Sequence, residues 1–447
     1  MKNIARIAAI AAVLASSGAA FAADASSAIS GRWDAMLTRN GTEIPFRLDI
    51  KGSGADLQGV LYDGFKPYDG TTSASFKDGK LTLNIEHYLT TISATLKDGQ
   101  LDGSVAALNR ETSANYGFHA VHHVETAAAD VNAPSIAGTW IIPLDTPSSK
   151  GEKAFRLIAQ QQGAEVSASI LRIDGDTGSY TGTFKDGKWI LSHFDGGRPG
   201  VITVTPAADG TLSVDQNNRP RAQQAASSNP YGSDATPDGR YAKVLTAYRQ
   251  DVAVAKGLPA PEDFLDHTKV RDPNEKFTFN FPDTNGKLTS QDDPRFKNKV
   301  VLAIVTGTWC PNCHDEAQYL VELDKKYRDK GLAIVALDFE EPEQQGTLNR
   351  EKAFIKKYGV KYTYLNAGAP AEMWEKVPQL NHLDTWPATV FIGRDGKVDA
   401  VHSGFASPAS GEFHTQLKQD FTARIERLLA QKSADATAEP RKFAAAQ

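Results

Sequence analysis

The sequence predicts a multidomain protein in which two tandem all-β units precede a C-terminal α/β domain. Three observations carry this prediction. The first half of the chain alternates apolar and polar residues in short runs, it repeats itself after about 108 residues, and the second half alternates apolar strands with helical segments. At 447 residues the chain is also longer than one ordinary domain.

Residues 27–128 form the first expected β-rich unit. Runs such as 32–37, 44–50 and 81–85 alternate as half-buried strands do. Asp78-Gly79 and Asp98-Gly99 are signals for two-residue hairpin turns. Together these features predict a β-meander.

Residues 134–217 form a second β-rich unit that echoes the first. Trp33 recurs as Trp140, at an offset of 107, and Phe46 recurs as Phe155, at an offset of 109. The run from Phe76 to Lys80 returns at an offset of 108. Because the register is kept, we expect two related units, either paired as a sandwich or closed as two small barrels.

Three histidines of the first unit, His119, His122 and His123, could mark a metal site. On an extended strand His119 and His123 share a face about 13 Å apart, and His122 points to the other face. We therefore expect a solvated strand end here and no metal.

Residues 1–22 are typical of a signal peptide. Lys2 and Arg6 precede the apolar run 7–14, which is too short to span a membrane, and Ala20-Phe21-Ala22 fits a cleavage site. We expect export to the periplasm with cleavage near Ala22 and no membrane span in the mature chain. An uncleaved N-terminal anchor is the alternative.

Charge and composition limit the partners and mark the flexible parts. The formal charge is −5, and −7 without Lys2 and Arg6, so no basic excess indicates nucleic acid as a partner. Residues 218–272 are expected to be a linker with one helix over 241–256, and residues 432–447 a disordered tail.

Residues 273–431 read as a mixed α/β domain. Strands are expected over 300–305, 332–338, 362–365, 388–392 and 398–401. Helices are expected from Cys310 to about Tyr327 and over 349–358, 371–377 and 413–431. The acids Asp338, Glu340 and Glu341 follow the second of these strands, and we expect a solvated loop for them.

Cys310 and Cys313 are the only cysteines of the chain. They lie where the buried strand over 300–305 meets a helix N-terminus, whose unpaired N–H groups and partial positive charge favour a thiolate at Cys310. Cys313, one turn deeper, can close a disulfide with Cys310 and release a mixed-disulfide partner. Pro311 suits the first helical position. In an exported chain this single pair predicts redox chemistry, because a structural disulfide closing so short a loop would stabilise little.

Two segments resemble a known family. The run from Trp309 to Cys313 resembles the active site of thioredoxin-fold proteins, and the run from Thr385 to Lys397 resembles their cis-proline strand and hairpin. Residues 273–431 as a whole resemble bacterial periplasmic reductases of the TlpA/ResA type. The resemblance implies a thioredoxin fold and a thiol-disulfide oxidoreductase without a cofactor. It assigns Cys310 and Cys313 as the catalytic pair.

The same resemblance implies roles for the neighbouring residues. Supporting residues are Trp309, Pro311, Asn312, Trp386 and Pro387, and residues that tune the thiols are His314 and Glu316. A cis Pro387 would face the cysteines and leave the backbone of Trp386 free to pair with an extended substrate. Trp386 would narrow that groove. The sequence departs from the family at Ile304, where many thioredoxins carry Asp, and at Gln318, where many relatives carry Pro.

The resemblance also implies partners. It favours reduction of disulfides in exported proteins, with cytochrome c biogenesis as one setting and a membrane thiol carrier as the electron donor. An oxidant role stays open.

Three other functions stay open from the residues alone. Cys310-Pro-Asn-Cys-His314 fits the pattern for c-type haem attachment, although it follows a buried strand and the mature chain has only Met36 and Met373 as methionines. A peroxiredoxin-like peroxidase is a second alternative, but its usual Thr is replaced by Gly307. The third is a non-catalytic envelope binding protein whose β units hold a ligand.

Overall fold

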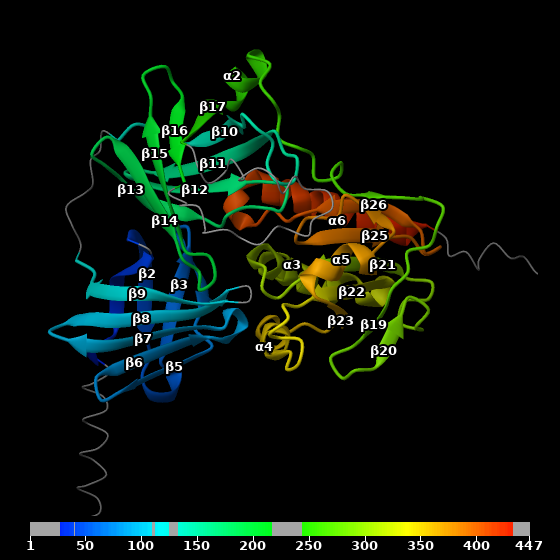
Figure 1. The fold of residues 1–447 in the computed structure, drawn as a ribbon, viewed down its shortest axis with the longest axis horizontal. Coiled ribbons are helices and arrows are strands. Elements are labelled where there is room, and N and C mark those ends of the chain that lie inside the picture. The colour runs from blue at the N-terminus through cyan, green and yellow to red at the C-terminus, as the bar shows by residue number, and fades with distance from the viewer. Residues whose placement is uncertain (1–26, 40, 110–111, 125–132, 217–243, 432–447) are drawn as a thin grey trace, which may run out of the picture. The chain divides into compact units, whose positions relative to one another are not determined.

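A computed structural model describes residues 27–39, 41–109, 112–124, 133–216 and 244–431 (Figure 1). The expected signal peptide, residues 218–243 of the expected linker and the expected tail lie outside these residues. The chain divides into two compact units. The first comprises residues up to 133 with 162–167 and 179–202, and the second comprises 134–161, 168–178 and the residues from 203 onward.

The first unit is built on a nine-stranded antiparallel sheet. Its strands are β1 (Gly31–Arg39), β2 (Thr42–Lys51), β3 (Gln58–Asp63), β4 (Lys66–Gly70), β5 (Ser73–Lys77), β6 (Lys80–Ile85), β7 (Thr90–Lys97), β8 (Gln100–Asn109) and β9 (Thr112–His122). They follow the order β4-β3-β2-β1-β9-β8-β7-β6-β5, so β1 pairs with both β2 and β9. The sheet is therefore a meander whose first and last strands join, and it ends at β4 and β5.

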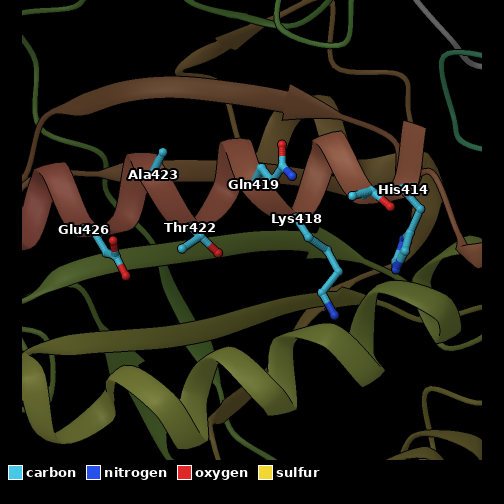
Figure 2. A pocket seen from close by; sticks show the side chains of 7 residues that line it. His414, Lys418, Gln419, Thr422, Ala423 and Glu426 are labelled. Carbon is cyan, nitrogen blue, oxygen red and sulfur yellow. The ribbon is translucent and has the colours of Figure 1, made fainter. Parts of the chain in front are cut away.

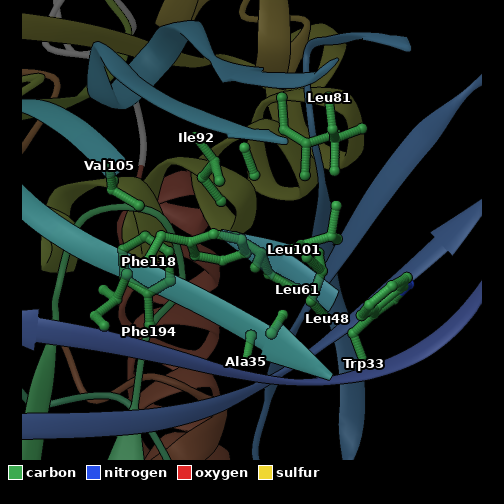
Figure 3. Close-up of a cluster of buried hydrophobic side chains, with 14 of the residues drawn as sticks. Trp33, Ala35, Leu48, Leu61, Leu81, Ile92, Leu101, Val105, Phe118 and Phe194 are labelled. Carbon is green, nitrogen blue, oxygen red and sulfur yellow. The ribbon is translucent and has the colours of Figure 1, made fainter. Parts of the chain in front are cut away.

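Alternating apolar residues of this sheet form the core of the first unit. Trp33, Leu48 and Phe118 point into one cluster, and Phe194 joins them (Figure 3). The hairpin signals are confirmed: Asp78 and Gly79 have φ of 51° and 72°, as a two-residue type I′ turn requires.

Eight strands after this sheet close into a barrel. They are β10 (Gly138–Pro143), β11 (Ala154–Gln162), β12 (Glu165–Leu171), β13 (Tyr180–Lys185), β14 (Lys188–His193), β15 (Gly200–Pro206), β16 (Leu212–Asp215) and β17 (Leu245–Arg249). The predicted repeat is confirmed in detail. Trp33 pairs with Leu48 and donates its indole N–H to the carbonyl of the residue four positions earlier, at 2.9 Å. Trp140 pairs with Leu157 and makes the same bond at 2.9 Å.

The expected helix over residues 241–256 is wrong in its first described half. Leu245–Arg249 is strand β17, and only Gln250–Ala255 is helical, as α2. Leu245 and Ala247 are buried while Thr246 is exposed, which is the two-residue period of a strand. Because β17 pairs with both β10 and β16, it closes the barrel and satisfies two sheet edges at once.

The α/β domain carries a five-stranded sheet in the order β23-β22-β21-β25-β26. Its strands are β21 (Val300–Thr306), β22 (Leu332–Phe339), β23 (Thr363–Gly368), β25 (Ala388–Ile392) and β26 (Val398–Ser403). The first three are parallel, and β25 and β26 are antiparallel to their neighbours. Its helices are α3 (Pro311–Tyr327), α4 (Asn349–Tyr358), α5 (Met373–Lys376) and α6 (Glu412–Ala430). Two short pairs complete the domain, β18 (Lys269–Val270) with β24 (Leu380–Asn381) and β19 (Asn280–Pro282) with β20 (Leu288–Ser290).

Burial on both faces of the sheet explains why the sequence of the central strand β21 is apolar throughout. Val301 and Val305 belong to the core on one face of the sheet. Leu302 and Ile304 belong to the core on the other face, where α3 and α6 pack. A strand buried on both faces needs no polar alternation. The expected thioredoxin-like arrangement is confirmed, and the active-site segment follows directly after this strand. Among the described residues, no helix combines the length and apolar character needed to cross a membrane.

Candidate active site

Cys310 and Cys313 lie at the junction that the sequence predicts. Cys310 is the N-cap of α3, in an extended conformation, and Pro311 occupies the first helical position. The N–H of Cys313 donates to the carbonyl of Cys310 at 3.0 Å. Both thiols are free and buried, with 5% of Cys310 and 2% of Cys313 exposed. The pair is therefore the dithiol form of a Cys-x-x-Cys site.

The environment of Cys313 keeps that thiol protonated. Burial, together with the neighbouring Cys310, raises the pKa of Cys313 well above its ordinary value, although bonds from Thr306 and Gly307 oppose this. A protonated thiol is a poor nucleophile. Cys313 therefore suits the second step of an exchange reaction, which requires that its proton be removed.

The Trp386–Pro387 peptide bond is cis, as the resemblance implies. The carbonyl of Trp386 accepts from the thiol of Cys310 at 3.5 Å. The rings of Trp309 and Trp386 meet edge to face with centroids 5.1 Å apart, and the Trp309 indole N–H donates to the carbonyl of Phe339 at 2.9 Å. Two tryptophans thus form one wall beside Cys310.

The backbone of Trp386 is not free, contrary to expectation. Its N–H donates to the carboxylate of Asp174 at 3.3 Å. Asn312, within the Cys-x-x-Cys segment, donates its side-chain amide to the carbonyl of the same Asp174 at 3.0 Å. Asp174 lies in the loop between β12 and β13. No local pattern predicts these contacts, because the partners are more than a hundred residues apart in the chain.

Glu316 supplies a buried carboxyl on the helix that begins beside Cys310. It lies one helical turn after Cys313, and one carboxylate oxygen accepts from the hydroxyl of Thr389. Thr389 pairs across the sheet with Ile304, the position where many thioredoxins carry Asp. Burial raises the pKa of Glu316 to about 8. The carboxyl of Glu316, on helix α3, thus bonds to the strand neighbour of Ile304, the residue that replaces the Asp of many thioredoxins.

Replacing Glu316 by Gln should change how stability depends on pH. The pKa of Glu316 is about 8 in the fold and 4.5 ordinarily, so the folded state binds more protons and loses stability as pH rises from about 4.5 to 8. Glu316→Gln removes this loss, and we expect the fall in unfolding free energy between pH 6 and pH 9 to shrink by at least about 1 kcal/mol. Urea denaturation at both pH values measures it. Glu375→Gln, on the exposed face of α5, is the control. If the fall in unfolding free energy between pH 6 and pH 9 were the same in Glu316→Gln as in the wild type, the raised pKa of Glu316 would be contradicted.

His314 is fully buried, and both of its ring nitrogens have hydrogen-bond partners. One ring nitrogen lies 2.9 Å from the hydroxyl of Tyr358, and the other lies 2.7 Å from the carbonyl of Thr308. The ring also meets Phe354 edge to face. Because both nitrogens are engaged in the core, His314 is not available as an axial haem ligand. Its contacts join α3 to α4 and to the turn before Cys310.

The expectation of a solvated loop for Asp338, Glu340 and Glu341 is wrong. All three are buried. The guanidinium of Arg350 on α4 lies 2.9 Å from both Glu340 and Glu341 and provides their cation. Burial raises the pKa of Asp338 well above its ordinary value and that of Glu341 to about 7. Glu340 also accepts from the backbone N–H of Thr308 at 3.2 Å. This acid cluster therefore fixes the turn that precedes Cys310.

A second buried charge cluster lies just before the cis-proline. His267 Nε2 is 2.6 Å from the carboxylate of Asp384, and Nδ1 is 3.0 Å from that of Glu262. Burial opposes a charge on this ring, but the bonds to Asp384 and Glu262 prevail and raise the pKa of His267 to about 9. Together with His382, His267 and Asp384 form the one set of three potential metal ligands within the described ranges. The close Nε2–carboxylate contact is that of an ion pair. Sequence reasoning missed it because the partners are distant in the chain.

Replacing His267 by Gln should destabilise the protein by about 3 kcal/mol near pH 7, because the buried carboxylate of Asp384 and the partly exposed carboxylate of Glu262 lose their cation. The pKa of His267 is raised from 6.5 to about 9 on folding, so the contribution is complete below about pH 6.5 and is lost as pH rises through 9. The penalty should therefore shrink at pH 10, as denaturation at the two pH values would show. His119→Gln, at an exposed pair with Asp102, should cost less than about 1 kcal/mol. A penalty for His267→Gln that is equal at both pH values would contradict a charged His267.

The three histidines of the first unit do not converge. Each has its own neighbour: Asp102 for His119, Trp33 for His122 and Asp34 for His123.

A groove along α6 also lies outside the predicted site. It is lined by His414, Thr415, Lys418, Gln419, Thr422, Ala423 and Glu426 (Figure 2). Lys418 spans toward α3, where its ammonium lies 2.9 Å from Glu322 and over the ring of Tyr319. The groove contains none of the residues that surround the cysteines.

Comparisons with known proteins agree with this geometry. A family model described as Redoxin matches residues 269–417. Thiol-disulfide oxidoreductase ResA of Bacillus thuringiensis (strain Al Hakam) is 31% identical over 135 residues, which are 30% of this chain and 71% of the relative. ResA of Bacillus subtilis (strain 168) is 27% identical over 141 residues, or 32% of this chain and 72% of the relative.

Solved structures resemble the same share of the chain. A putative thiol:disulfide interchange protein DsbE from Chlorobium tepidum is 20% identical and covers 34% of this chain and 98% of its own, with a TM-score of 0.27. A secreted Mycobacterium tuberculosis disulfide oxidoreductase is 20% identical and covers 34% and 96%, with a TM-score of 0.26. The Redoxin match spans the described domain that holds Cys310 and Cys313.

Proposed function

Because this chain belongs to the ResA-like family of thiol-disulfide oxidoreductases, we propose that it is an exported reductase of disulfides in envelope proteins. The observation that carries the proposal is the buried dithiol at the start of α3, with the Cys310 thiol next to the carbonyl that precedes a cis-proline.

The first step is attack by the Cys310 thiolate on one sulfur of the substrate disulfide. A mixed disulfide forms between Cys310 and the substrate, and the other substrate sulfur leaves as a thiolate that takes up a proton. Trp386 and Trp309 form the wall against which the substrate sulfur approaches.

The second step is attack by Cys313 on the Cys310 sulfur. The second substrate thiol is released, and the enzyme becomes a disulfide, so two electrons and two protons have passed to the substrate. Since the pKa of Cys313 is raised, its proton must move to a base. We assign Glu316, three residues after Cys313 on α3, as the group that accepts it when the carboxyl is ionised, because a pKa of about 8 makes this carboxylate a stronger base than an ordinary Glu. A membrane thiol carrier would then restore the dithiol.

Export and direction can be tested in bacterial cells that express the full chain. Acid quenching followed by alkylation with a mass-shifting reagent reports the redox state of the pair, and fractionation reports its compartment. We expect a processed protein in the periplasm whose cysteines are mainly reduced. Cys310→Ser/Cys313→Ser gives the position of the unshifted band. A cytoplasmic protein, or a pair that is mainly oxidised, would contradict the proposal.

A further inference from the structure

We propose that the loop between β12 and β13, residues 172–178, determines substrate specificity by occupying the groove beside Cys310. The loop takes the backbone donor that an extended protein substrate would use, so such a substrate must displace it, whereas a small disulfide need not. The inference deepens the proposed function and rests on its thiol chemistry, but not on its direction.

Asp174 makes the contacts that fill the groove. Its carboxylate accepts from the N–H of Trp386 at 3.3 Å, at the position where strand addition would place a substrate carbonyl. Its own carbonyl accepts from Asn312 at 3.0 Å and from the N–H of Phe405 at 3.1 Å. One residue of the loop thus bonds to the segment before the cis-proline, to the Cys-x-x-Cys segment and to the strand end beyond β26.

Lys150 holds Asp174 in this place. Its ammonium pairs with the carboxylate of Asp174 and donates to the carbonyl of Asp384 at 2.6 Å. Asp384 lies two residues before Trp386 and is itself fixed by His267. The pair of Lys150 and Asp174 therefore clamps the groove from the barrel side.

The rest of the loop is built into the α/β domain. Asp176 is buried and accepts from the N–H of Ser407 at 2.7 Å and from the hydroxyl of Ser410 at 2.6 Å. Gly175 pairs with Phe405 as in a parallel sheet, and a Cβ at Gly175 would overlap the carbonyl oxygen of Phe405. Ile158 and Leu171 of the barrel strands belong to the same apolar core as Phe405 and helix α6. The loop is thus a fitted occupant of the groove.

An internal occupant that must leave lowers the apparent affinity for whatever competes with it. An extended protein segment needs the Trp386 N–H and therefore competes with Asp174. A small disulfide needs only to reach the sulfur of Cys310, a residue that is 5% exposed. Removing Asp174 should thus lower KM for protein disulfides and leave kcat and small-disulfide exchange unchanged, because it relieves competition without changing the reacting thiols.

The test compares two substrates in turnover by the mature chain, with a dithiol donor that restores the Cys310–Cys313 dithiol after each cycle. Insulin is the protein disulfide, and hydroxyethyl disulfide is the small one, chosen because it is uncharged and does not sense the lost carboxylate. For Asp174→Ala we expect KM for insulin to fall about tenfold, with kcat and the hydroxyethyl disulfide rate within twofold of wild type. Asp174→Asn keeps an acceptor for the Trp386 N–H and should stay within about threefold of wild type.

Two further variants keep the test decisive. Lys150→Met releases the clamp without touching the groove and should lower KM for insulin less than Asp174→Ala does. Asp251→Ala, on the exposed first turn of α2, should change nothing. An insulin KM unchanged in both Asp174→Ala and Lys150→Met would overturn the proposal. Equal acceleration of both substrates would also overturn it, because it would indicate general exposure of Cys310. If hydroxyethyl disulfide fails to react even with wild type, the thiol chemistry itself fails, which is a separate result.

Discussion

Replacing Cys310 by Ser is expected to lower insulin reduction by at least about a thousandfold. A hydroxyl at this position stays protonated near neutral pH and cannot replace the thiolate as the attacking group. Serine has nearly the same shape as cysteine. It can also occupy the N-cap of α3 and donate to the carbonyl of Trp386, so the fold should persist. Turnover with a dithiol donor, compared with the thermal unfolding midpoint of the same variant, separates lost chemistry from lost structure.

Replacing Cys313 by Ser should have a different outcome. Cys310 still attacks, but the mixed disulfide cannot be resolved from within, so it accumulates as a covalent adduct with an oxidised substrate. A non-reducing gel shows the adduct, and Cys310→Ser/Cys313→Ser should show none. If Cys313→Ser turned over normally, or if Cys310→Ser formed the adduct, the roles of the two thiols would be reversed from those assigned.

Replacing Arg350 by Met should destabilise the protein by about 3–5 kcal/mol at pH 8, because it leaves Glu340 and Glu341 buried without their cation. The penalty should be smaller at pH 5.5. The pKa of Glu341 is about 7 in the fold against 4.5 ordinarily, so the carboxyl is neutral there and needs no partner. Denaturant unfolding at the two pH values measures both effects.

Lys352→Met is the matched control for this variant. Lys352 lies on the same helix but is exposed, so its loss should cost less than about 1 kcal/mol at either pH. Equal costs for Arg350→Met and Lys352→Met would contradict a buried acid cluster that depends on Arg350. Because Glu340 also bonds to the N–H of Thr308, we further expect Arg350→Met to slow exchange at Cys310.

The features that could be predicted from the sequence are those encoded locally. The run from Val300 to Cys313 predicts a buried strand, a turn and a helix, and the structure confirms all three. The Asp-Gly turns fix the hairpins because both residues accept positive φ. The repeat of Trp33 as Trp140 predicts the same indole bond in both β units.

The features that could not be predicted depend on partners far apart in the chain. The apolar pattern around Leu245 and Ala247 is too short to distinguish a strand from a helix. The segment is a strand because it pairs with the open edges of β10 and β16, which lie far away in the chain. A solvated loop is predicted for Glu340 because no residue in its own segment indicates that Arg350 pairs with it. Asp174 and Trp386 are 212 residues apart, in segments that the sequence assigns to different domains, so no local pattern predicts that Asp174 occupies the backbone N–H of Trp386.

The reduction potential of the Cys310–Cys313 pair tests the central claim most directly. The purified mature chain would be equilibrated in a series of dithiol buffers, and the fraction reduced would be read by alkylation mass shift. A reductase should have a potential near that of thioredoxin, about −270 mV. A value near that of a strong oxidant, about −120 mV, would contradict reduction as the direction of this enzyme.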